Sequence, residues 1–180
     1  MSTRLVPLTD ETIPAESADI IKRWPLNLHR VLAHNPQTLA SWLQFGEHIL
    51  RNNSLPERER EIIILRVAWN WQSDYEWGLH VRLARSIGMS EADITAIARG
   101  GADSHWSPLE AALVAATDDI HAHQPIGDKT WGVLAAHFTP GQLIDLVMLV
   151  GEFSLVAMIL SSFQIAKENI PDLPTLASYQ

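Results

Sequence analysis

Apolar residues recur every three or four positions along most of the chain, with polar residues between them. This spacing is typical of helices that bury one face. No stretch shows the strict alternation of apolar and polar residues that marks a half-buried strand. The pattern predicts an all-α fold of about eight helices joined by short connections.

Serines, threonines and prolines mark where these helices begin. Proline is favoured at the first helical position because the amide hydrogen that it lacks would have no partner there. A serine or threonine followed three residues later by an acid or a glutamine predicts a capping box, in which both side chains bond backbone amides. The predicted starts are Pro36, Pro56, Ser73, Ser90, Ser107 and Thr139. The helix from Ser73 is expected to run to Ile87 and to stop at Gly88.

The last helix, from residue 140 to about residue 167, is predicted to be the longest and most apolar. Residues 143–163 within it have nearly the length of a membrane span. Asp145 and Glu152 lie inside this window, and an acid near the centre of a bilayer costs about 2.5–3.5 kcal/mol. We therefore expect a helix buried in a protein core or a subunit interface, and no membrane partner.

The length of 180 residues fits a single domain spanning residues 1–180. The chain contains no cysteine, which excludes disulfides, iron–sulfur clusters and thiol-based peroxidase chemistry. A formal net charge of −8, with no run of Lys and Arg, argues against nucleic acid as a partner. The N-terminal stretch MSTRLVPLTDETIP holds no apolar core of a secretory signal, so we expect a cytoplasmic protein.

Glu76 and His80 lie four residues apart on the helix predicted from Ser73, so they share a face that continues through apolar positions. A carboxylate beside an imidazole in an apolar setting raises the pKa of the histidine and orients one ring nitrogen. This suits proton transfer near neutral pH. The alternative is that Glu76 caps its helix and His80 is a hydrogen-bonded core histidine.

Glu61 and Glu152 are further acids that the helical period places among apolar residues. Glu61 shares a face with Leu65, although it also follows the charged run 57–60 and would then be an edge residue. An unpaired carboxylate at Glu152 would be costly, so this residue needs a partner or water, either as a structural pair or as part of a pocket.

Tryptophan is frequent in this chain, with seven residues in all, and several lie near the acids. The candidate pocket residues are Ser73, Trp42, Trp69, Trp77 and Glu152. Core packing or an oligomer interface is the alternative use of each tryptophan. His121 and His123 are two apart on a helix and diverge, so we expect them to be structural.

Residues 55–89, LPEREREIIILRVAWNWQSDYEWGLHVRLARSIGM, resemble the central motif of the carboxymuconolactone decarboxylase and alkylhydroperoxidase D superfamily. Its peroxidases carry a glutamate on one helix and Cys-x-x-Cys-x-x-x-His at the start of the next. Their glutamate and histidine form a proton relay for the thiols. Glu61 and His80 match the relay positions, whereas Ser73 and Glu76 stand where the cysteines would be.

The resemblance covers residues 26–165, because LAHNPQTLASWLQFGEHIL is also similar to the helix ahead of that motif. It implies an all-helical, alkylhydroperoxidase D-like subunit that assembles as a homotrimer or homohexamer, with pockets near subunit contacts. Without cysteines the chain lacks peroxidase and disulfide-reductase activity. It is similar instead to the cysteine-free, decarboxylase-like members.

The leading hypothesis is a cofactor-independent lyase or isomerase that acts on a small carboxylated lactone or keto acid. His80 would be the acid, Glu76 its orienting partner and Glu61 a second relay member. The protein then needs to desolvate the carboxylate, stabilise an enolate and deliver a proton to carbon. Arg66 and Arg82 are the nearest cationic residues in sequence, but Arg82 is expected to point away from His80.

Two other hypotheses come from different classes of protein. One is a non-catalytic oligomeric scaffold or binding protein, in which the glutamate and histidine serve only the core. The other is a metal site on Glu61, Glu76 and His80, which supplies three ligands but no signature spacing. The leading hypothesis involves no metal and no cofactor, and its partner is a small-molecule substrate.

Overall fold

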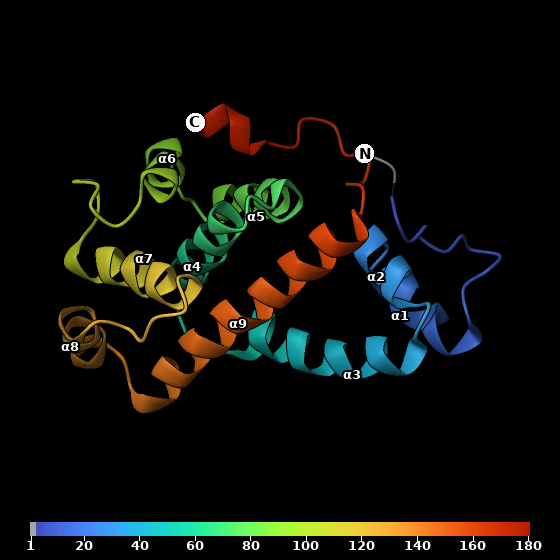
Figure 1. The fold of residues 1–180 in the computed structure, drawn as a ribbon, viewed down its shortest axis with the longest axis horizontal. Helices are drawn as coiled ribbons and strands as arrows, with labels where there is room; N and C mark the ends of the chain where they lie inside the picture. The colour runs from blue at the N-terminus through green and yellow to red at the C-terminus, as the bar shows by residue number, and fades with distance from the viewer. Residues whose placement is uncertain (1–2) are drawn as a thin grey trace. The chain divides into compact units, whose positions relative to one another are not determined.

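A computed structural model describes residues 3–180. Every regular element in this range is helical, with nine α-helices, so the predicted all-α fold is confirmed. The residues cluster into two compact units: Met1–Asn52 with Met158–Pro171, and Asn53–Ala157 with Asp172–Gln180. We call them the first and the second unit. Figure 1 labels the helices and colours them from blue at the N-terminus to red at the C-terminus.

The first unit contains η1 (Ala15–Ser17), α1 (Ala18–Arg23), α2 (Asn27–Leu32), α3 (Pro36–Glu47) and the π-helical turn η2 (His48–Asn52). As predicted, Pro36 is the first residue of α3, and the Asn35 side chain accepts a backbone hydrogen bond from the first turn. Ile21, Ala33 and Leu39 form the buried centre of this unit. Apolar residues of the neighbouring helices pack against them.

His29 lies buried in the first unit, next to the rings of Trp24 and Trp42 at centroid distances of 6.2 and 5.7 Å. Its Nδ1 has no hydrogen-bond partner in the part of the chain that the structure describes. Burial lowers its pKa to about 4, from an ordinary value of 6.5. The folded state therefore binds this proton more weakly than the unfolded state does.

We expect His29 to make the chain less stable as pH falls from about 6.5 to about 4, because the unfolded state takes up the proton first. The full loss is about 2–3 kcal/mol. Denaturant unfolding measured across this pH range checks the prediction. The free energy of unfolding of His29→Phe should fall less steeply with falling pH than that of the wild type. The exposed control His48→Phe should show the wild-type dependence on pH. Equal slopes for the wild type and His29→Phe would contradict the prediction.

The second unit contains α4 (Glu57–Asn70), α5 (Asp74–Ser86), α6 (Glu91–Arg99), α7 (Pro108–His121), α8 (Asp128–His137), most of α9 (Pro140–Phe163) and η3 (Leu176–Tyr179). Its central helix is α4, which packs against α5, α6 and α7 (Figure 1). Residues 61–65 of α4 are all buried, so this helix is surrounded by protein along its middle.

Three of the four predicted capping boxes form. They pair Ser90 with Asp93, Ser107 with Glu110 and Thr139 with Gln142. The prediction is wrong at Ser73, which precedes α5 but whose side chain makes no capping hydrogen bond. The Glu76 side chain is buried, and neither of its carboxylate oxygens makes a capping hydrogen bond.

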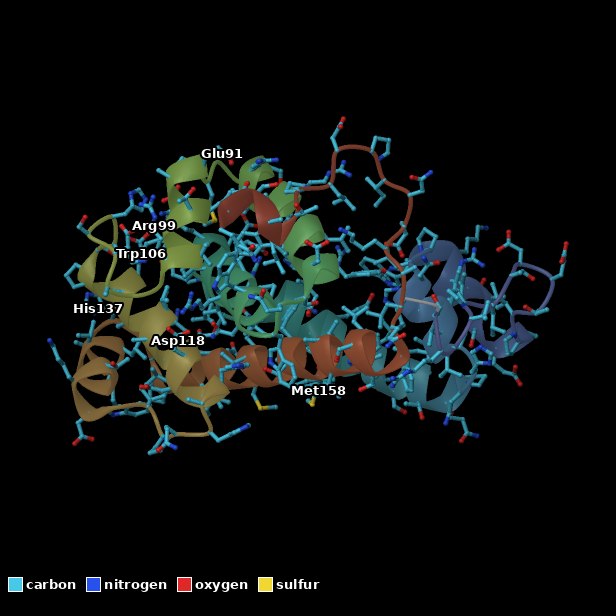
Figure 2. All side chains as sticks on the ribbon, turned by 45° about the horizontal axis from the view of Figure 1, so that its top comes forward. Glu91, Arg99, Trp106, Asp118, His137 and Met158 are labelled. Atoms are coloured by element: carbon cyan, nitrogen blue, oxygen red, sulfur yellow. The ribbon has the colours of Figure 1, made fainter. Side chains whose placement is uncertain are left out.

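Arg66 fastens α4 to α6 and α7. Its Nε lies 2.6 Å from Oδ1 of Asp118 and its Nη2 lies 2.9 Å from Oδ2, a bidentate pair. Its Nη1 donates to the carbonyls of Ile97 and Ala98 at the end of α6. Asp118 is labelled on α7 in Figure 2. These contacts make Arg66 a structural anchor.

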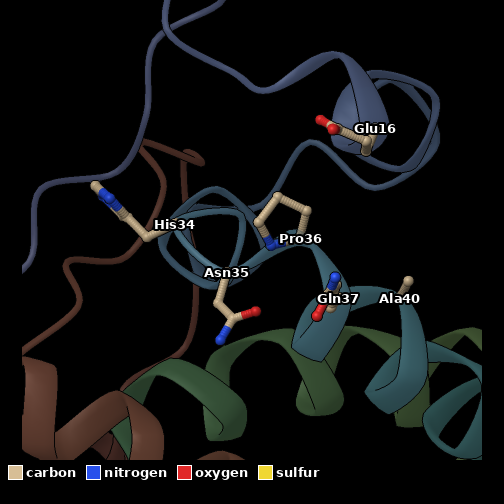
Figure 3. A pocket seen from close by; sticks show the side chains of 6 residues that line it. All are labelled: Glu16, His34, Asn35, Pro36, Gln37 and Ala40. Carbon is tan, nitrogen blue, oxygen red and sulfur yellow. The ribbon is translucent and has the colours of Figure 1, made fainter.

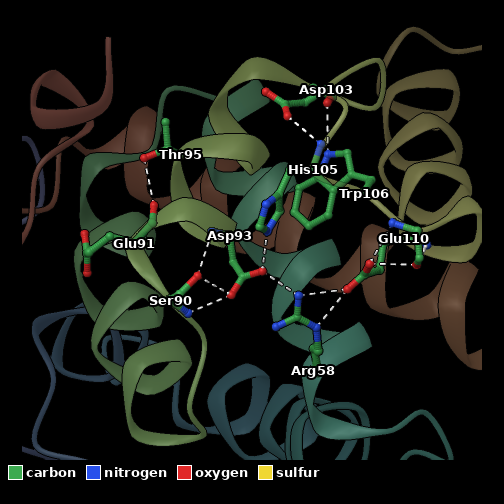
Figure 4. A network of polar contacts seen from close by, with 11 residues as sticks. Arg58, Ser90, Glu91, Asp93, Thr95, Asp103, His105, Trp106 and Glu110 are labelled. Carbon is green, nitrogen blue, oxygen red and sulfur yellow. Dashed lines mark hydrogen bonds and ion pairs between the residues drawn. The ribbon is translucent and has the colours of Figure 1, made fainter.

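Arg58 joins the same three helices at the start of α4. Its guanidinium donates to Asp93 on α6 at 2.6 Å and to Glu110 on α7 at 2.8 Å, and His105 adds a second contact to Asp93 at 2.7 Å (Figure 4). Burial alone raises the pKa of Asp93, but the hydrogen bonds from Arg58 and His105 outweigh it and hold that pKa well below its usual range. Asp93 therefore stays ionised and the network stays intact at neutral pH.

The C-terminal strap, residues 172–180, runs back across α5. The backbone amide of Leu176 donates to the Asp74 carboxylate at 2.8 Å, and the Tyr179 hydroxyl accepts from Arg85 at 3.1 Å. Leu176 is buried. The strap thus covers the back of a helix that lies far from it in sequence.

Gly78 on α5 lies directly against this strap. A Cβ at this position would come within 2.9 Å of the Pro174 carbonyl oxygen, a backbone atom that moves only with the strap. We expect Gly78→Ala to displace the strap and to lower the free energy of unfolding by about 1–3 kcal/mol, although alanine favours helix.

Carboxypeptidase digestion of the C-terminus together with denaturant melts checks the Gly78 prediction. Gly151→Ala is the matched control because a Cβ there meets no atom within 4 Å. It should stabilise the chain slightly and leave digestion unchanged. Digestion of Gly78→Ala at the wild-type rate would show that the strap tolerates the added methyl group.

α9 ends at Phe163, earlier than predicted, and buries only part of its surface. By length and composition alone it could cross a membrane: its most apolar window has a mean hydropathy of 2.3, and 44% of that window is buried. The exposed apolar side chains follow a helical period and form one stripe: Ile144, Val147, Met148 and Leu155. Asp145 accepts hydrogen bonds from the backbone amide and hydroxyl of Ser54, both at 2.7 Å.

Candidate functional site

A hydrogen bond between α4 and α5 forms the centre of the candidate site. Nδ1 of His80 lies 2.9 Å from Oε2 of Glu61. The Glu61 side chain is 3% exposed and the His80 side chain 13%, so water reaches only part of the imidazole. Glu61 is therefore an inward-facing residue and not the edge of the charged run that precedes it.

Glu61, and not Glu76, is the hydrogen-bond partner that orients His80. The assignment of that role to Glu76 from its spacing is wrong, because two side chains on one helix face are neighbours without being bonded, while Glu61 approaches from the adjacent helix. A carboxylate only accepts, so Nδ1 carries the hydrogen and Nε2 is left for proton exchange. Burial lowers the pKa of His80, but the charge and hydrogen bond of Glu61 outweigh burial and raise it overall.

Glu76 is 3% exposed, and neither of its carboxylate oxygens has a hydrogen-bond partner of normal geometry within residues 3–180. Burial raises the pKa of Glu76 to about 7. The Ser73 hydroxyl and the positive charge of His80 oppose this rise, and the negative charge of Glu152 adds to it. A carboxyl group that titrates near neutral pH gives up and takes back a proton readily.

α9 contributes two adjacent side chains to the same region. Glu152 is 4% exposed and acts on Glu76 as a like charge. The ring of Phe153 meets the His80 ring edge-on, with 5.0 Å between centroids and 89° between planes. Sequence reasoning missed Phe153 because α9 is apolar on all sides, so periodicity singles out no face.

The predicted pocket tryptophans divide between the two units. Trp77 is fully buried and packs against Trp69, at 5.4 Å between centroids, and against Tyr179 of the strap, at 5.3 Å. Trp42 belongs to the first unit, where it packs against His29. Of the three, only Trp69 and Trp77 belong to the unit that contains the site.

His121 and Asp118, both on α7, have structural contacts. His121 packs edge-on against Trp71, and Asp118 is engaged by Arg66. In the range that the structure describes, no three His, Asp or Glu side chains are grouped as metal ligands. The metal hypothesis for Glu61, Glu76 and His80 therefore has no geometric support.

A surface pocket of about 430 Å³ belongs to the first unit (Figure 3). It is lined by Glu16, His34, Asn35, Pro36, Gln37 and Ala40. His34 Nε2 lies 3.0 Å from the Val6 carbonyl oxygen. None of the predicted site residues lines this pocket, so it is separate from the Glu61–His80 pair.

The sequence profile of the Carboxymuconolactone decarboxylase family matches residues 36–119, which include Glu61, Glu76 and His80. None of the curated protein sequences matches the chain. Two solved structures with the same fold are uncharacterized peroxidase-related proteins. The one from Ralstonia eutropha JMP134, an alkylhydroperoxidase AhpD core, is 15% identical over 93% of each chain with a TM-score of 0.77. The one from Silicibacter sp. TM1040 is 16% identical over 93% of this chain and 92% of that one, with a TM-score of 0.78.

A third similar structure is the debrominase Bmp8 in complex with 2,3,4-tribromopyrrole, 12% identical over 94% of each chain with a TM-score of 0.77. These structures establish an alkylhydroperoxidase D-like fold. The model of the Carboxymuconolactone decarboxylase family matches residues 36–119 of this fold, a little under half of the chain. The chain contains none of the cysteines that peroxidases of this fold use.

Proposed function

We propose that this chain is a cofactor-independent enzyme that moves a proton at carbon, as a lyase or an isomerase acting on a small carbonyl compound. Glu76 carries the proposal: it is buried, it has no hydrogen-bond partner in the described residues, and its pKa is raised to about 7. It also lies beside a histidine that Glu61 orients. Perturbed acids of this kind are typical of catalytic sites.

In the proposed isomerisation, ionised Glu76 removes a proton from the carbon next to the substrate carbonyl. The electron pair of that C–H bond moves toward the carbonyl oxygen and forms an enolate, which Nε2–H of His80 stabilises. Glu61 holds the ring through Nδ1–H. Return of the proton from Glu76 to a different carbon regenerates the carboxylate and completes the reaction.

In the alternative decarboxylation, the bond to a substrate carboxylate breaks and its electron pair forms the enolate, with release of carbon dioxide. Protonated Glu76 then donates its proton to carbon. This is the branch expected for a carboxylated lactone or keto acid. The protein supplies desolvation, enolate stabilisation and the proton in both branches.

The comparisons support an enzyme that acts on a small molecule, without indicating which substrate or reaction. One protein with this fold is a debrominase that binds 2,3,4-tribromopyrrole, and the family is named for a decarboxylase. Peroxidase chemistry is not proposed, because this chain has no cysteine to form the thiolate.

Two measurements on a panel of small ketones, lactones and keto acids test the proposal. They are hydrogen–deuterium exchange at carbon and release of carbon dioxide. The wild type should exchange or decarboxylate at least one member. His80→Gln should reduce its rate by about 10²-fold or more, the usual contribution of a general acid or base. Glu57→Gln, on a side chain that is 69% exposed, should leave the rate unchanged. A folded wild type without activity on the whole panel would contradict the proposal.

The second candidate function is a self-associating scaffold, favoured by the exposed apolar stripe on α9. Under it the chain forms a homotrimer or homohexamer through this stripe. Leu155→Glu and Ile144→Glu should then lower the mass measured by light scattering to that of a monomer, whereas the exposed control Glu11→Gln should not. A wild type that is monomeric at high concentration would exclude this candidate.

A further inference from the structure

Three polar side chains lie in a row along one face of α5. They belong to Ser73, Glu76 and His80, which are separated by three and then by four residues. Positions at this spacing share one face of a helix. At a rise of about 1.5 Å per residue, the row is about 10 Å long along the helix axis, with Glu76 near its middle. We call these residues the α5 row; a small molecule lying along this face meets all three.

The role of Ser73 in the α5 row is not yet explained. Ser73 is the N-cap residue of α5, but its hydroxyl makes no capping hydrogen bond. Its oxygen is buried without a hydrogen-bond partner of normal geometry within residues 3–180, and so are both carboxylate oxygens of Glu76. Buried polar atoms are nearly always bonded, to protein, to water or to a ligand. Three such oxygens within one helical turn are therefore suited to bind the polar part of a small molecule.

The two ends of the α5 row can each donate a hydrogen bond. The Ser73 hydroxyl is the donor at one end. His80 is bonded to Glu61 through Nδ1 at 2.9 Å, so Nε2–H of the protonated ring is the donor at the other end. A hydrogen bond of about 2.8 Å at each end leaves about 5 Å between two acceptor oxygens of a ligand. With standard bond lengths, the oxygens of an extended 1,3-dicarbonyl group are also about 5 Å apart.

The carbon atom between two carbonyl groups suits the base in the middle of the α5 row. Burial raises the pKa of Glu76 to about 7, so its carboxylate is a stronger base than an exposed one, although it is still weak for removing a proton from a simple ketone. A second carbonyl group makes this C–H bond more acidic, because the negative charge spreads over two oxygens. Proton removal then has a driving force that a carboxylate can supply.

We propose that the substrate is a 1,3-dicarbonyl compound, such as a 1,3-diketone or a β-keto ester, and that Ser73 binds one carbonyl oxygen while His80 binds the other. This inference rests on the proposed proton-transfer function and narrows it. Glu76 removes the proton from the carbon between the carbonyls, and the electron pair of that C–H bond spreads over both oxygens as an enolate. Return of the proton to a different atom of the enolate gives the isomer and regenerates the carboxylate.

Two ligands that differ by one carbonyl group, 2,4-pentanedione and 2-pentanone, test the inference at pH 7. Binding is read from the NMR signals of the His80 ring in protein labelled at histidine and assigned with His80→Gln. The dione should bind to the wild type at least about fivefold more tightly than the ketone, which corresponds to about 1 kcal/mol for one added hydrogen bond. Equal binding, or no detectable binding of the dione to the folded protein, would overturn the inference.

Ser73→Ala shows whether Ser73 causes this preference. It should weaken binding of the dione at least about fivefold and leave 2-pentanone unchanged, because His80 binds the single carbonyl group. Ser86→Ala is the matched control on the same helix: Ser86 is exposed and its hydroxyl donates to the Leu83 carbonyl, so neither ligand should be affected. Equal weakening of both ligands by Ser73→Ala, or an unchanged affinity for the dione, would overturn the inference.

The binding measurement is independent of turnover, so the two proposals fail separately. A preference for the dione that depends on Ser73, without proton exchange at carbon in any compound, would contradict the proposed function and leave the dicarbonyl site standing. Suppose instead that simple ketones are accelerated over their uncatalysed exchange rates as much as diones are. That result would overturn the dicarbonyl inference and leave the proposed function standing.

Discussion

Glu76→Gln is expected to raise the free energy of unfolding at pH 8 by about 2–3 kcal/mol while abolishing the proposed proton transfer. The folded-state pKa of Glu76 is about 7 and its ordinary value is 4.5, so the folded state holds this proton more tightly than the unfolded state. The contribution is fully present below about pH 4.5 and is lost as pH rises through 7. The glutamine side chain has no charge to bury, so the free energy of unfolding of Glu76→Gln should not show this loss as pH rises.

Urea unfolding of the wild type and Glu76→Gln at several values between pH 4.5 and 8 checks this prediction. The two curves should lie close together at pH 4.5 and separate as pH approaches 7. Glu57→Gln, at an exposed position, should run parallel to the wild type throughout. If Glu76→Gln is the less stable protein at pH 8, the carboxylate makes stabilising contacts and is not poised for catalysis.

Asp118→Ala is expected to lower the free energy of unfolding by about 2–3 kcal/mol, because it leaves the Arg66 guanidinium without its carboxylate partner. The Arg66 side chain is only 12% exposed, while Asp118 is 35% exposed, so solvent screening keeps the effect below that of a fully buried pair. Asn70 also loses its 2.8 Å hydrogen bond to Asp118.

A double-mutant cycle separates the ion pair from other effects of the Asp118 change. Once Asp118→Ala has been made, Arg66→Met should cost less than it does in the wild type, since the ion pair is already broken and only the bonds to the carbonyls of Ile97 and Ala98 remain to be lost. Asp19→Ala, on an exposed acid of α1, should change stability by less than about 1 kcal/mol. Additive losses for Asp118→Ala and Arg66→Met would show that the two side chains act independently.

Much of the fold can be predicted from the sequence because helix boundaries are set locally. Pro36 begins α3, and the boxes at Ser90 and Ser107 close as the spacing requires. Each depends on groups within one turn of helix. The box at Ser73 does not form, and Glu76 is buried in surroundings that other helices contribute to, which local spacing does not specify.

The candidate site can be predicted only in part. Helical spacing places Glu76 and His80 on one face, but it says nothing about what approaches that face from other helices. The bond from Glu61 and the ring of Phe153 are contacts between elements. Trp42 shows the same limit: its helical position is regular, yet it packs in the first unit with His29.

The C-terminal strap reaches α5 only late in the synthesis of the chain. Leu176 bonds to Asp74, which is synthesised 102 residues earlier. At about 5–20 residues per second, the ribosome delivers the strap roughly 5–20 s after α5. During that interval α5 already carries Glu76 and His80 but has no cover on its back. A message cut short near its end would therefore yield a protein with every proposed site residue, in which α5 keeps its packing on α4 but lacks the contacts of the strap.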